Sequence, residues 1–308
     1  MGKIAFVFPG QGAQAVGMGQ DVYEAFPASR AIIDAADEAL GFKLSEIIFQ
    51  GPEEQLKQTA NTQPALLAVS IALLEALKEH GLKPDYVAGH SLGEYSALVA
   101  AGALSYEDAI RTVRARGEFM EQAVPSGQGA MAAVLGAERE ALAALCISAS
   151  ADAGAVELAN VNCPGQIVVS GTAAGVQAVV ERGKEAGAKR VIPLEVSGPF
   201  HSSLMKPAAA RLESVLASVT FADAAVPVIA NVTAQPVTNS GEIRKLLAEQ
   251  VYSPVLWEDS VRYLIDQGVD TFVEIGSGTV LAGLIKKIDK TVTVIPVNSL
   301  EALKAVAL

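Results

Sequence analysis

Ser91 stands in the pattern Gly89-His90-Ser91-Leu92-Gly93, which can present a serine hydroxyl for attack on a carbonyl carbon. A short apolar run precedes the serine and a helical pattern follows it. Between a strand and a helix, the two glycines permit a tight turn, a nucleophile elbow, and the first helical turn offers N–H groups to a developing oxyanion. The same pattern also occurs in plain turns, so a structural role stays open for it.

A serine nucleophile needs a base, and the chain offers three histidines. His80 ends a helical pattern, where a cation near a helix C-terminus is the simpler explanation. His90 is the neighbour of Ser91, and neighbouring side chains on such a turn point apart. His201 lies in a loop at an expected domain junction, which makes it the candidate base, although a structural role is equally open for it.

A third group, an acid that orients the imidazole, has no persuasive candidate. A triad in the order Ser, Asp or Glu, His needs that acid between residues 91 and 201. Asp108 and Asp152 lie in this interval, but neither stands at the end of a convincing strand. We therefore expect a pair of Ser91 and His201 in which a backbone carbonyl can orient the ring.

Strand and helix signals alternate around these residues, which predicts an α/β fold. The expected strands of the main domain are 4–8, 85–89, 225–231, 271–275 and 292–297. The expected helices are 28–40, 64–80, 92–101, 105–124, 240–250 and 260–267. Pro64 is expected at the start of its helix, where its missing N–H costs nothing.

Residues 127–197 follow an order of their own, which is β-α-β-β-α-β and ferredoxin-like. The expected elements are 131–135, 138–146, 156–162, 166–170, 172–186 and 189–193, with a surface loop in the Ala/Ser/Gly-rich 150s. We expect this small domain to be inserted into a main domain formed by residues 1–126 and 198–308.

The composition of the 308 residues predicts a soluble, cytoplasmic protein with a large buried core, because 51% are hydrophobic. A net charge of −11 makes a nucleic-acid partner improbable. Two unpaired cysteines and three scattered histidines give neither a disulfide framework nor a metal site. The N-terminus is too short for a signal segment, and no apolar stretch is expected to reach the ~20 residues of a membrane span.

Four segments, in this order, resemble the malonyl-CoA:acyl-carrier-protein transacylases of bacterial fatty acid synthesis. They are Pro9-Gly10-Gln11-Gly12-Ala13-Gln14, Gly89-His90-Ser91-Leu92-Gly93-Glu94, Arg114-Ala115-Arg116-Gly117 and Gly198-Pro199-Phe200-His201. The similarity extends to about residue 300 and includes 160–166 and Gln250. It implies an α/β-hydrolase-like core with an inserted ferredoxin-like domain.

The resemblance implies an acyltransferase that moves malonyl from malonyl-CoA to the phosphopantetheine thiol of acyl carrier protein through a Ser91 ester, by a ping-pong route. It implies no cofactor, and a monomer that contacts neither membrane nor nucleic acid. The implied roles are nucleophile and base for Ser91 and His201; oxyanion hole and ring orientation for Gln11, Leu92 and Gln250; and substrate binding for Arg116, His90, Phe200 and Asn162. Two other functional interpretations are compatible with the serine pattern. One is a serine esterase or thioesterase, and the other is a non-catalytic scaffold.

Arg116 has the side chain that suits the free malonyl carboxylate. A guanidinium can hold a carboxylate with two parallel charge-assisted hydrogen bonds, which lysine cannot reproduce. Arg116 shares a helical pattern with Arg111 and Arg114, so without the resemblance a surface charge is the simpler interpretation. Phe200, beside the base, is expected to crowd an α-methyl group on the substrate.

Overall fold

The computed structural model describes residues 2–306. Its strands are β1 (Lys3–Phe8), β2 (Tyr86–Gly89), β3 (Gly129–Leu135), β4 (Val156–Cys163), β5 (Gln166–Thr172), β6 (Arg190–Pro193), β7 (Val228–Ile229), β8 (Pro236–Val237), β9 (Val255–Leu256), β10 (Val269–Ile275) and β11 (Thr293–Val297). Over these residues they form two sheets, with the orders β11-β10-β1-β2-β7-β8 and β6-β3-β5-β4-β9.

The α-helices of residues 2–306 pack partly on the two sheets and partly on one another. They are α1 (Gln20–Ala25), α2 (Pro27–Leu40), α3 (Leu44–Gln50), α4 (Glu53–Lys57), α5 (Thr59–Leu77), α6 (Gly93–Ala100), α7 (Tyr106–Gln122), α8 (Arg139–Asp152), α9 (Ala173–Arg182), α10 (Lys206–Ser218), α11 (Ser240–Gln250), α12 (Trp257–Asp266), α13 (Val280–Ile288) and α14 (Leu300–Lys304). Short 3₁₀ turns cover Lys78–His80, Gly183–Ala186 and Ser203–Met205.

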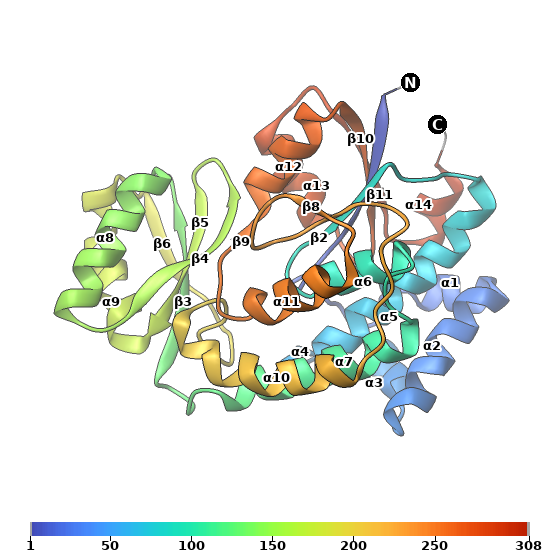
Figure 1. The fold of residues 1–308 in the computed structure, drawn as a ribbon, viewed down its shortest axis with the longest axis horizontal. Helices are drawn as coiled ribbons and strands as arrows, with labels where there is room; N and C mark the ends of the chain where they lie inside the picture. Colours follow the sequence, from blue (N-terminus) through green and yellow to red (C-terminus); the bar gives the residue numbers. More distant parts are fainter. Residues whose placement is uncertain (1, 307–308) are drawn as a thin grey trace.

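The larger sheet is buried on both faces, as its central strand β1 illustrates. Ala5 and Val7 pack in one apolar cluster with α12 and α13, while Phe6 and Phe8 pack in another with α5 and α6. Figure 1 shows these two pairs of helices on opposite sides of the sheet. All its strand pairs are parallel except β7 with β8, so the carboxyl ends of β1, β2, β7 and β10 share one edge.

The smaller sheet confirms the predicted ferredoxin-like order. Antiparallel pairs join β6 to β3, β3 to β5 and β5 to β4, and α8 and α9 cover its outer face (Figure 1). Together with the larger sheet, this gives the expected α/β-hydrolase-like core with a ferredoxin-like small domain. Strand β9, which lies outside 127–197, pairs in parallel with β4 and extends this sheet from the main domain.

Several predicted elements were wrong in detail. Pro64 lies inside α5, which begins five residues earlier, and the strand expected at 225–231 is only β7. The expected surface loop of the 150s begins later, because α8 continues to Asp152. Helices α10 and α13 were not expected from the sequence, since their short amphipathic patterns gain stability mainly from packing.

The expectation about membrane-length segments was also wrong. Thr59–His80 is long and apolar enough to cross a membrane by length and composition. However, 94% of its most apolar window is buried inside the fold, as expected for the core helix of a globular protein. The helix predicted at 64–80 began at Pro64 and was therefore five residues too short.

Candidate active site

The turn between β2 and α6 exposes Ser91 at the carboxyl end of its strand. Ser91 has a φ of 52°, in the left-handed region that non-glycine residues rarely adopt. A Cβ on Gly89 would lie 1.9 Å from the backbone of Gly93, and one on Gly93 would lie 2.2 Å from the Phe8 carbonyl oxygen. Both glycines are therefore required by close backbone packing, which distinguishes this nucleophile elbow from a plain turn.

His201 lies within hydrogen-bonding distance of the serine. Its Nε2 is 2.8 Å from Ser91 Oγ, and its Nδ1 is 2.9 Å from the backbone oxygen of Gln250. The carbonyl can only accept, so Nδ1 carries the proton and Nε2 is free to accept the serine proton. The arrangement is thus a Ser–His pair oriented by a carbonyl, and neither Asp108 nor Asp152 takes part in it.

Burial keeps the His201 imidazole neutral. Removal from water, followed by the nearby positive charge of Arg116, lowers the pKa of His201 to about 3. A neutral imidazole is the form that can act as a base, so His201 is in the required state at neutral pH.

Arg116 is a buried cation beside the serine, so the alternative interpretation as a surface charge does not hold. Its side chain is 1% exposed, with Nη2 3.1 Å from Ser91 Oγ and 3.0 Å from Gln250 Oε1. Its Nη1 donates to Gln63 Oε1 at 2.7 Å. Among residues 2–306 no carboxylate forms a salt bridge with it, and its Nε has no hydrogen-bond partner. The buried Glu94 carboxylate meets it only through Gln250, which bonds to both. A buried guanidinium without a direct carboxylate partner is costly, unless a ligand supplies the negative charge.

Two backbone N–H groups are available for an oxyanion. Gln11 and Leu92 both line the cleft beside Ser91. Within the described part of the chain, neither backbone N–H donates to another protein group. Leu92 directly precedes α6, so its N–H lies at the positive end of a helix, where negative charge is stabilised.

His90 and Asn162 form a second polar group in the same cleft. His90 Nε2 is 2.8 Å from Asn162 Oδ1, and its ring lies 5.7 Å from that of Trp257. Burial lowers the pKa of His90, so this imidazole is also neutral. If Nε2 carries the proton, the Asn162 oxygen is occupied, which leaves the amide N–H groups as donors for a ligand.

The cleft lies between the two sheets. Asn160, Asn162, Gln166 and Val168 line it from the small domain, and the elbow residues line it from the core. Apolar side chains form much of the remaining wall, namely Met120, Met131, Leu194, Val196, Phe200, Val280, Leu281 and Leu284. A cleft lined by apolar side chains and by the polar groups around Ser91 suits a mostly uncharged chain that carries a reactive carbonyl.

Comparison with known proteins agrees with this geometry. Residues 5–301 match the acyl transferase domain family. The chain is 57% identical to the malonyl CoA-acyl carrier protein transacylase of Bacillus subtilis, over 99% of this chain and 96% of that protein. The chain belongs to the malonyl CoA-acyl carrier protein transacylase family. A relative with the same name from Staphylococcus aureus is 52% identical, over 99% and 98% of the two chains.

Solved structures of this transacylase family share the whole fold. An acyl carrier protein S-malonyltransferase from Vibrio cholerae is 46% identical with a TM-score of 0.96, over 99% of this chain and all of that one. A malonyl-transacylase in complex with its type II polyketide-synthase acyl-carrier protein is 42% identical with a TM-score of 0.95, over 98% of each chain.

Sequence reasoning missed three polar residues of this transacylase site. Asn231 accepts from the Ser91 N–H at 2.7 Å and donates to the Gly89 carbonyl at 2.7 Å, so it spans the strained turn. Glu94 accepts from the Asn231 N–H and from Gln250 Nε2, and burial raises its pKa to about 7. Gln63, the third, is the acceptor of Arg116. Their only sequence signal was Glu94 following the elbow.

Proposed function

We propose that the protein transfers a malonyl group from malonyl-CoA to the phosphopantetheine thiol of acyl carrier protein through an ester on Ser91. The main support is the buried guanidinium of Arg116, which lies 3.1 Å from Ser91 Oγ and forms no salt bridge with a carboxylate of residues 2–306. A malonyl thioester held at Ser91 brings a carboxylate into the same space. The transferred group supplies chain elongation in fatty acid synthesis.

In the first half-reaction, Ser91 Oγ attacks the thioester carbonyl while His201 Nε2 takes its proton. The N–H groups of Gln11 and Leu92 stabilise the oxyanion. The C–S bond then breaks, and His201 returns the proton to the coenzyme A sulfur. The malonyl carboxylate offsets the charge of Arg116 that lowers the pKa of His201, so substrate binding makes the base stronger.

The second half-reaction repeats these steps with the carrier. The phosphopantetheine thiol gives its proton to His201 and attacks the malonyl ester, and Ser91 leaves with that proton. Coenzyme A must depart before the carrier arm enters the same cleft, which makes the cycle ping-pong. Each proton is accounted for by His201, so we propose that no cofactor is required.

Intact-mass measurement after brief incubation with malonyl-CoA tests this proposal. We expect a malonyl adduct on the wild type, none on Ser91→Ala, and discharge of the adduct when holo acyl carrier protein is added. Loss of the adduct to water without the carrier would indicate a thioesterase. Absence of any adduct on the wild type would indicate a non-catalytic protein.

We propose that the protein is a cytoplasmic monomer. We also propose that it binds neither nucleic acid nor membrane, since its net charge of −11 repels phosphate groups. Native mass measurement on the same sample should give one chain of 31.8 kDa. Of the basic residues near the cleft, Lys287 Nζ lies 3.3 Å from Gln166 Oε1, whereas Lys286 donates to the Val292 carbonyl. Lys287 is therefore the better candidate for contact with an acidic carrier.

Phe200→Ser should increase transfer of methylmalonyl relative to malonyl. The ring is 6% exposed and lines the cleft beside the base, so its removal opens space for an α-methyl group. One methyl group changes selectivity by about 10–200-fold, and we expect a change at the lower end. The matched control is Phe119→Ser, because that ring stacks on Arg211 away from the cleft. Equal ratios of kcat/KM in both variants and the wild type would refute the steric role.

A further inference from the structure

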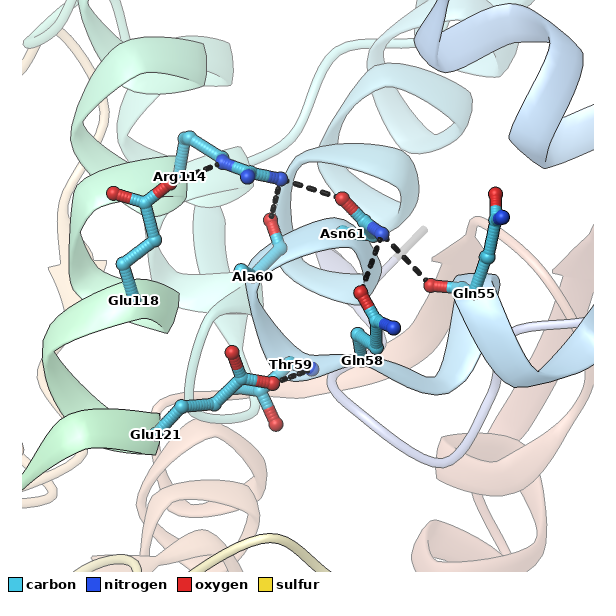
Figure 2. Close-up of polar contacts among 8 residues, drawn as sticks. All are labelled: Gln55, Gln58, Thr59, Ala60, Asn61, Arg114, Glu118 and Glu121. Carbon is cyan, nitrogen blue, oxygen red and sulfur yellow. Dashed lines mark hydrogen bonds and ion pairs between the residues drawn. The ribbon is translucent and has the colours of Figure 1, made fainter.

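The proline inside α5 leaves one backbone carbonyl without its helical partner. Pro64 has no N–H, so the carbonyl of Ala60, four residues earlier, cannot accept the usual helical hydrogen bond. Arg114 Nη1, from α7, donates to this oxygen at 3.1 Å and also to Asn61 Oδ1 (Figure 2). An arginine of one helix thus completes the hydrogen bonding of another.

Further contacts hold the same turn of α5 against α7. Glu121 accepts from the Thr59 N–H at 2.6 Å, which caps the first residue of α5. Gly117 lies between these contacts, and a Cβ there would lie 2.7 Å from Ala60 Cα. Glu118 accepts from Arg114 Nε at 2.7 Å and fixes the direction of its guanidinium. Figure 2 shows Arg114 and Glu121 reaching from α7 to the start of α5, with Glu118 beside Arg114.

The turn held in this way carries two groups of the active site. Gln63, one turn after Thr59, is the acceptor of Arg116 Nη1. Thr59 Oγ1 accepts from the side chain of Gln11, whose backbone N–H is a proposed oxyanion donor. Gln63 and Arg116 come from different helices, so their 2.7 Å contact depends on how α5 lies against α7.

We propose that Arg114 is a positioning residue for the substrate carboxylate site, acting through the carbonyl that Pro64 leaves free. The inference rests on the proposed function of Arg116. Arg114 touches neither Ser91 nor Arg116 and does not line the cleft. Its loss lets the first turn of α5 shift, so Gln63 no longer holds the Arg116 fork in line with the serine.

The test is a rescue experiment. Arg114→Gln should raise the KM for malonyl-CoA about tenfold, with kcat within about threefold of the wild type. It should also lower the preference for malonyl-CoA over acetyl-CoA. In the Pro64→Ala background, residue 64 has an N–H that can donate to the Ala60 carbonyl. There, Arg114→Gln should raise the KM no more than about threefold.

The matched control is Arg111→Gln on the same helix. The Arg111 side chain is 57% exposed and forms an ion pair with Asp108, so all kinetic constants should stay at wild-type values. Arg114→Lys is the second variant, for use where Arg114→Gln folds poorly. It keeps the charge but lacks the planar guanidinium that contacts Glu118, the Ala60 carbonyl and Asn61 together, so its KM should rise in the same way. Unfolding midpoints of the variants show whether folded protein is lost. Such a loss lowers kcat alone, whereas mispositioning of Arg116 raises the KM.

Two results would overturn the inference. One is an unchanged KM and selectivity in both Arg114 variants. The other is a KM increase that Pro64→Ala does not reduce, because the effect would then not pass through the Ala60 carbonyl. Arg116→Ala, measured in parallel, distinguishes these failures from a failure of the proposed function. Equal loss of malonyl and acetyl transfer in that variant would contradict the carboxylate site itself.

Discussion

His201→Ala should lower the kcat of malonyl transfer by about 10²–10⁴-fold, the typical contribution of general acid–base catalysis. The imidazole is the acceptor within 2.8 Å of Ser91 Oγ, so its removal leaves the hydroxyl without a base. The KM for malonyl-CoA should change little, because Arg116 and the cleft remain. Steady-state kinetics with holo acyl carrier protein, together with the rate of adduct formation, would measure both effects.

The pH profile of the wild type gives a second check on the same residue. His201 acts in its neutral form, and burial with the charge of Arg116 lowers its pKa to about 3. Activity should therefore persist as the pH falls through about 6.5, the ordinary pKa of histidine, and decline only at lower pH. His80→Ala, at an exposed position after α5, is the matched control and should leave activity unchanged. Glu94, whose pKa burial raises to about 7, is the other group near the serine that titrates in this range, so the profile is also measured in Glu94→Gln. A decline in kcat/KM centred near pH 6.5 in both proteins would contradict the assigned environment of His201.

Arg116→Ala should lower kcat/KM for malonyl-CoA by about 10²–10³-fold, as expected for truncating one partner of a buried, hydrogen-bonded charge pair. Any transfer of acetyl from acetyl-CoA should fall much less, since acetyl has no carboxylate. The measurement is the ratio of the two kcat/KM values, which cancels any loss of folded enzyme.

Arg116→Lys sharpens this result. Lysine keeps the positive charge but cannot make two parallel hydrogen bonds to a carboxylate. It also cannot contact Gln63, Gln250 and Ser91 together, as the guanidinium does. We expect the lysine variant to lie between alanine and wild type in its preference for malonyl. A lysine variant equal to the wild type would mean that charge alone suffices, and equal losses on both substrates would contradict the carboxylate site.

The proposed catalytic pair was accessible from sequence because each member lies in a contiguous pattern. Ser91 is marked by glycines that the tight turn requires, and His201 by its loop position after the small domain. Asn231 had no such mark, since it follows a two-residue strand and meets Ser91 from 140 residues away. Glu94 likewise meets the Asn231 N–H from 137 residues away. Residues that act only through distant partners leave little trace in local spacing.

The same distinction explains the fold predictions. The β-α-β-β-α-β order was predictable, since its strands and helices alternate within one stretch of chain. The start of α5 was misplaced because proline usually marks a first turn. Here Arg114 replaces the missing helical hydrogen bond from outside the helix, so the helix extends in front of Pro64. A tertiary contact thus overrode a reliable local rule.

The pairing of β9 with β4 determines whether the small domain can be transferred to another protein by itself. Val255 and Leu256 come from the main domain, yet they complete the edge of the small sheet. A graft of residues 127–197 alone into another scaffold would expose the backbone of β4 as an open edge, which is a site for aggregation. Exchanges of substrate-binding halves between related enzymes should therefore transfer the segment around β9 together with the insertion.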